Sequence, residues 1–118
     1  MKVLIAKIRL VECPEGDVED VALVSPELDQ ELGDDELYNA FISVVDAPVF
    51  ATEGDAMTYA RDRARELGCR DTRVRFVRPS RSTALRLAKL LNEVRKGRSI
   101  HELAKEFRSL AIAIHRAR

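Results

Sequence analysis

The N-terminal segment places apolar residues at every second position, and this spacing constrains the fold more than any other feature of the chain. Leu4, Ala6, Ile8 and Leu10 fall on one face of an extended segment that covers residues 2–12. The opposite face mixes apolar residues with two basic ones. The segment is therefore predicted to be a strand that is buried on one side and partly solvated on the other.

Three further segments have the composition of strands. Residues 18–24, "VEDVALV", follow a turn at Pro14 and Gly16, and they predict an antiparallel partner for the first strand. Residues 41–45, "FISVV", predict a third strand because β-branched side chains favour extended backbone. Residues 72–77, "TRVRFV", predict a fourth strand, with its arginines on one face and its apolar residues on the other.

Helical signals separate these strands. Loose helical turns are expected across residues 26–40, and a longer helix begins after Thr52 and ends at Gly68. Alanines 56, 60 and 64 and Leu67 form the buried stripe of that helix, which connects the third and fourth strands as a crossover if the two are parallel. We expect an α+β fold with a sheet of about four strands, in the order β-β-α-β-α-β, and a helical layer.

The composition changes after Pro79, where strand formers give way to two helices. We expect one domain, 1–118, made of an α/β core (1–79) and a C-terminal αα-hairpin, the basic helical hairpin 80–118. Ser80 or Ser82 caps the first helix, Gly97 ends it, and Ser99 caps the second. Apolar residues then recur at intervals of three and four, which predicts one helix over 100–116; they are Ile100, Leu103, Phe107, Leu110, Ile114 and Ala117.

Part of this hairpin supports a different interpretation. Within residues 85–107, the letters "LAKLLNEVRKGRSIHELAKEF" resemble the first two helices of the helix-turn-helix domain of resolvases and invertases. The resemblance implies a turn near Arg108 followed by a helix that reads DNA in the major groove. However, Arg108 stands where the family has a glycine, and the residues that follow it are mostly apolar. The continuous helix is therefore favoured, and the helix-turn-helix stays as the alternative.

The distribution of charge is strongly asymmetric, although the net charge is zero. Residues 1–60 hold fourteen acidic and three basic residues, whereas residues 61–118 hold seventeen basic and six acidic ones. Such a separation indicates that the two halves face each other, within or between subunits, or that each faces its own partner.

No metal, redox or cofactor motif is present in the sequence. Cys13 and Cys69 are far apart, so they form no CxxC motif, and free thiols are favoured. A disulfide between them remains open if the source is heat-adapted, as fifteen arginines and only three amide side chains indicate. His101 and His115 would lie about 21 Å apart along one helix, too far to share a metal ion. The acidic residues between 27 and 36 are interpreted as a solvated face.

These observations predict a non-catalytic, cytoplasmic module of archaeal or thermophilic type, without cofactor or membrane segment, that forms a homo-oligomer or binds a protein partner. Its expected interaction surface is on the last helix, at Leu110, Ile112 and Ala113. The alternative is a nucleic-acid-binding regulator, and an enzyme with an unrecognised site is the third interpretation. The nucleic-acid alternative assigns phosphate contacts to six basic residues of the C-terminal helices: Arg81, Arg86, Arg95, Lys96, Arg98 and Arg108.

Overall fold

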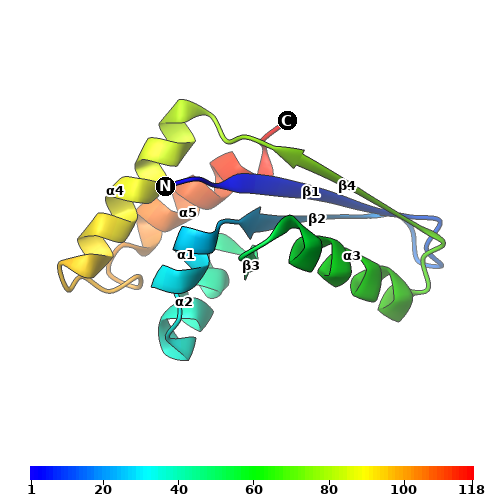
Figure 1. Ribbon diagram of the computed structural model, residues 1–118, viewed down its shortest axis with the longest axis horizontal. Helices are drawn as coiled ribbons and strands as arrows, with labels where there is room; N and C mark the ends of the chain where they lie inside the picture. Colours follow the sequence, from blue (N-terminus) through cyan, green and yellow to red (C-terminus); the bar gives the residue numbers. More distant parts are fainter.

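The computed structural model, which describes residues 1–118, has an α+β fold with one mixed four-stranded sheet (Figure 1). The strands are β1 (Leu4–Val11), β2 (Val18–Val24), β3 (Val49–Phe50) and β4 (Asp71–Val77). They lie in the order β3-β2-β1-β4; β1 is antiparallel to both β2 and β4, and β3 is parallel to β2. The fold class predicted from the sequence is confirmed.

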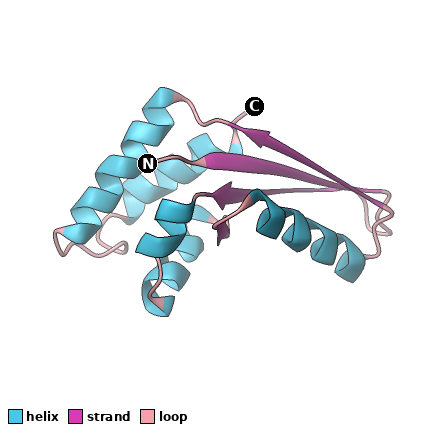
Figure 2. Cartoon of the chain, in the orientation of Figure 1, coloured by secondary structure: helices cyan, strands magenta, loops and turns pink.

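Helices cover both faces of this sheet (Figure 2). They are α1 (Pro26–Glu31), α2 (Asp35–Val45), α3 (Glu53–Leu67), α4 (Arg81–Arg95) and α5 (Ala104–His115). Helix α3 packs alone against one face, and the other four helices pack against the opposite face. The sequence predicted one helical layer, whereas the structure has two.

The two faces of β1 enter different cores. Ala6, Ile8 and Leu10 are buried against α3, whose contribution is three alanines that let the helix lie close to the sheet. On the other face, Ile5 is buried in a larger cluster that contains side chains from the C-terminal helices. The alternation predicted for the first strand is therefore confirmed, and so are the bounds of β2.

The predicted third strand at residues 41–45 is wrong, because these residues form the second half of α2. The carboxylate of Asp34 accepts hydrogen bonds from the backbone N–H groups of Glu36 and Leu37 and so begins the helix. Phe41 and Val45, four residues apart, are both fully buried. Burial at helical spacing outweighs the preference of β-branched residues for strands. The third strand is instead the two-residue β3.

The connection between the last two strands joins parallel strands, as predicted, but it passes over the two strands that lie between them. Because β3 is parallel to β2, and β1 is antiparallel to β2 and β4, strands β3 and β4 run in the same direction. They occupy opposite edges of the sheet, so α3 passes across β2 and β1 to connect them. Thr52 caps α3 and Gly68 ends it in the left-handed conformation, as expected, but Leu67 is exposed.

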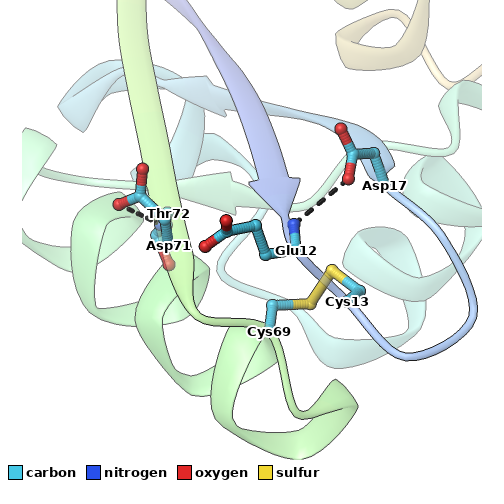
Figure 3. The surroundings of a disulfide bond; sticks show 6 residues. All are labelled: Glu12, Cys13, Asp17, Cys69, Asp71 and Thr72. Carbon is cyan, nitrogen blue, oxygen red and sulfur yellow. Dashed lines mark hydrogen bonds between the residues drawn. A yellow bond between two sulfur atoms is a disulfide. The ribbon is translucent and has the colours of Figure 1, made fainter.

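Cys13 and Cys69 form a disulfide, so the free thiols favoured from the sequence are wrong (Figure 3). The bond joins the β1–β2 turn to the loop between α3 and β4. Both segments lie at the end of the sheet that is remote from the C-terminal helices (Figure 1). The disulfide therefore fixes the two connections that close this end of the sheet.

The C-terminal segment is an αα-hairpin, as predicted. Ser80 caps α4, and the hydroxyl of Ser99 accepts a hydrogen bond from the N–H of Glu102, but the regular helix begins one turn later than predicted, at Ala104. Helix α5 then continues through Arg108 without a break. The turn that a helix-turn-helix requires at this position is absent, so the structure favours the continuous helix.

A substitution at Arg108 tests this continuity by stability. We expect Arg108→Gly to lower the free energy of unfolding by about 1 kcal/mol, because glycine is a poor helix former, and to lower Tm by about 4 °C. The control is Arg108→Ala, which removes the same side chain but keeps helix propensity. Thermal unfolding that shows Arg108→Gly to be as stable as Arg108→Ala, or more stable, would contradict a helix at this position.

Candidate functional site

The two helical layers are displaced relative to each other along the sheet (Figure 1). Helices α4 and α5 gather at the end of the sheet where β1 begins, whereas α3 extends toward the disulfide end. As a result, the face opposite α3 is covered at one end and open at the other. Arg9, Glu19, Arg73 and Arg75 are all exposed on this open part.

The floor of the open face consists of four cations from two neighbouring strands. In the register between β1 and β4, Lys7 lies directly opposite Arg75, and Arg9 lies directly opposite Arg73. Residues directly opposite in an antiparallel pair have Cβ atoms about 5 Å apart, and like charges in such positions destabilise the sheet. The floor therefore concentrates positive charge at a cost to the stability of the free protein.

The C-terminal end of α5 lies beside these four cations. It forms one side of a cleft, which we call the wall, and the four cations form the floor of the cleft. The ammonium group of Lys7 donates a hydrogen bond of 2.9 Å to the carbonyl oxygen of His115, and His115 Nε2 lies 3.0 Å from the carbonyl oxygen of Val45. These contacts attach the wall to β1 and α2. Arg116 and Arg118 follow and complete a cleft of about 810 Å³.

The positive charge of the cleft is balanced at one end only. At the disulfide end, the guanidinium group of Arg9 lies 3.4 Å from a carboxylate oxygen of Asp17, and that of Arg73 lies 3.1 Å from a carboxylate oxygen of Asp71. Figure 3 shows both aspartates beside the disulfide. At the wall, neither Lys7 nor Arg75 is paired with a carboxylate. An anion in the cleft would find its unpaired cations there.

Two further acidic residues line the cleft, Glu19 and Asp20. Glu19 lies opposite Arg9 in the register between β1 and β2. Asp20 accepts a hydrogen bond of 3.4 Å from the hydroxyl of Tyr59, which belongs to α3, so the carboxylate of Asp20 is held on the α3 face of the sheet.

Burial raises the pKa of the Tyr59 phenol above its usual value of 10.0, and the charge of Asp20 raises it further.

The six basic residues predicted to bind nucleic acid do not form one cluster. Three of them lie at the connection between α4 and α5 and are paired with carboxylates: Arg95 with Glu31, and both Lys96 and Arg98 with Glu93. Arg81 is at the opposite end of α4, about 21 Å away along the helix axis. The structure thus separates the set into at least two regions.

Arg86 and Arg108 are the remaining two, and both are exposed. Arg86 donates a hydrogen bond of 3.2 Å to the hydroxyl of Ser109 and lines a shallow groove between α4 and α5. Lys89 and Lys105 line the same groove, which is a second, smaller basic surface.

The predicted apolar interaction surface on the last helix is not continuous. Leu110 is fully buried in the core, so it is not available for a partner, and Ala113 is half-buried. Ile112 is 54% exposed. The residues one helical turn before and after it are Arg108 and Arg116, both exposed, and it lines a small pocket with Val45, Asp46, Ala111 and His115, so Ile112 does not belong to a large apolar surface.

The sequence contained a signal for the cleft that its interpretation missed. The alternation within β4 predicted that Arg73 and Arg75 share one face, and the alternation within β1 implied the same for Lys7 and Arg9. What the sequence does not contain is the pairing of β1 with β4, two strands that are sixty residues apart. Only that register makes the four side chains neighbours.

No group of three or more histidine, cysteine or carboxylate side chains is arranged to hold a metal ion. None of the helices has the length and apolar character needed to cross a membrane. No protein-family model, curated protein or solved structure matches the chain. The assignment of a function therefore depends on the cleft itself.

The contact between Tyr59 and Asp20 predicts how stability depends on alkaline pH. Because the folded state raises the pKa of the phenol, the stability that it contributes is present below pH 10.0 and is lost as the pH rises through the folded pKa. We expect Tyr59→Phe to lose stability less steeply between about pH 9 and pH 11. Chemical denaturation across this range measures the effect, and identical slopes for the two proteins would contradict it.

Proposed function

We propose that this chain is a non-catalytic protein that binds nucleic acid through phosphate groups in the cleft between β1, β4 and the end of α5. The observation that supports this most strongly is the pairing of like charges, Lys7 with Arg75 and Arg9 with Arg73, on an uncovered face. Bound phosphates would reverse the unfavourable interaction by placing negative charge between the cations.

The chemistry of the lining favours phosphates over a protein surface. Five of the six cations of the cleft are arginines, whose planar guanidinium groups bind phosphate oxygens in a bidentate manner. Protein interfaces also use arginine, but there it accompanies tryptophan and tyrosine side chains that fill pockets. The cleft has no tryptophan, tyrosine or phenylalanine, and two of its four apolar lining residues, Ile8 and Val74, pack toward α3.

Self-association is the second candidate, and the separation of charge supports it. Acidic residues gather on α1 and α2, and the basic cleft of a second copy would be their complement. The apolar contribution that the sequence assigned to such an interface is reduced, because Leu110 is buried.

A cytoplasmic location in a heat-adapted, archaeal-type source remains part of this proposal. For a protein in the cytoplasm, the disulfide favours a heat-adapted source, since intracellular disulfides persist in hyperthermophiles. The scarcity of amide side chains, together with the many residues that can form ion pairs, supports it as well.

Titration of labelled DNA and RNA with charge-neutralised variants tests the proposed function. We expect wild-type binding to weaken steeply with salt, and we expect Lys7→Gln and Arg75→Gln each to weaken binding to every sequence and to reduce the salt slope by about 0.7–0.9. The matched control is Arg61→Gln, which removes an exposed arginine from α3 on the other face of the sheet. It should leave binding unchanged.

Two results would overturn this assignment. If Arg86→Gln weakens binding more than Arg75→Gln, the groove between α4 and α5 is the nucleic-acid site. If the protein binds no nucleic acid at low salt and its mass in sedimentation falls as salt is added, the charged surfaces act in self-association.

A further inference from the structure

We infer that the ligand of the cleft is a single strand of nucleic acid and that a double helix does not reach the innermost cations. The strand binds in the angle between the floor (Lys7, Arg9, Arg73 and Arg75) and the wall (the C-terminal end of α5), which we call the crease. This inference rests on the proposed function and specifies the ligand of the same site. The observation behind it is that cations approach the cleft from two directions: Lys7 and Arg75 from the floor, and Arg116 and Arg118 from the wall.

The crease is fixed in shape by backbone contacts. Lys7, in the middle of β1, is hydrogen-bonded to the carbonyl oxygen of His115, so the wall rises directly beside a floor cation. The ring of His115 lies against the carbonyl oxygen of Val45 at the end of α2. A ligand that uses Lys7 and Arg116 together must therefore fit between a sheet surface and a helix end.

The spacing of the floor cations suits a single backbone. Lys7 and Arg9 are two residues apart on β1, which is about 6.6 Å, and their partners on β4 are about 5 Å across the sheet. Four positive charges are thus within reach of a few successive phosphates of one strand. In a duplex the two backbones are separated by grooves about 12 Å and 6 Å wide, and they lie on a convex surface. Such a surface can rest on the rim of the crease but does not enter it.

The cleft also predicts how the strand is recognised. The phenylalanine and tyrosine side chains of the chain all lie in or against the two cores, and the one ring that lines the cleft is the imidazole of His115, whose Nε2 lies 3.0 Å from the carbonyl oxygen of Val45. Phe76, although on β4, packs toward α3. Binding is therefore carried by phosphates and guanidinium groups, with little dependence on base sequence and strong dependence on salt.

The experiment compares strands and duplexes of the same sequence on the intact protein. Fluorescence anisotropy is measured with labelled oligonucleotides of about 12 residues, single-stranded and annealed, over a series of salt concentrations. We expect the single strand to bind at least about tenfold more tightly than the duplex, with a slope of log K against log salt between about −3 and −4 for four to six phosphates. Arg75→Gln should abolish most of the difference, and Arg86→Gln should preserve it.

The outcomes separate this inference from the proposed function. A duplex that binds as tightly as the strand, with Arg75→Gln still impaired, overturns the single-strand inference and leaves the nucleic-acid site in place. Failure of both forms to bind overturns both. Poly-glutamate that displaces the strand as effectively as unlabelled strand of equal charge also overturns the inference, because the cleft would then select charge alone and fit an acidic protein.

Discussion

One face of strand β1 packs against helices at one end and is exposed to solvent at the other. The arrangement of the helices follows from this change along the strand. The face with Ala6, Ile8 and Leu10 is apolar along its whole length, so α3 can cover it to the disulfide end. The opposite face is apolar at Ile5, basic at Lys7 and Arg9, and apolar again only at its last residue, Val11. Helices that bury apolar surface can pack only against its first part.

The exposed half of the sheet consequently has no second helical layer to stabilise it. The disulfide, which closes a loop of 56 residues at this end, compensates by restricting the unfolded chain. The ion pairs Arg9–Asp17 and Arg73–Asp71 lie at the same end and offset part of the repulsion. The other opposed pair, Lys7 and Arg75, has no carboxylate partner and lies next to the wall formed by α5, so we expect the repulsion to be greatest there. This residual repulsion is the feature that an anionic ligand would relieve.

The sequence predicted those parts of the fold that depend on local spacing. The strands β1, β2 and β4, the capped helix α3 and the C-terminal hairpin all follow from periodicity and caps that are readable within a short window. Residues 41–45 were misassigned because Phe41 and Val45 are buried by contacts with distant helices, which propensity does not include.

The cleft was missed for a related reason. Its four floor cations come from strands far apart in the chain, and each pair by itself resembles an ordinary solvated strand face. The disulfide likewise depends on a meeting of two loops that no local pattern encodes.

The proposed function implies that Lys7 and Arg75 repel each other in the free protein and that an anion bound between the cations relieves this repulsion. Thermal unfolding of Arg75→Thr at low and at high salt, without ligand, measures this repulsion most directly. Removal of one of two directly opposed like charges should raise stability by a few tenths to about 1 kcal/mol at low salt, and the gain should shrink as salt screens the wild-type repulsion. An increase in Tm at low salt that fades at high salt is the result expected. A Tm that falls on substitution, or that changes equally at both salt concentrations, would show that the opposed cations do not repel each other and that an anion has no repulsion to relieve.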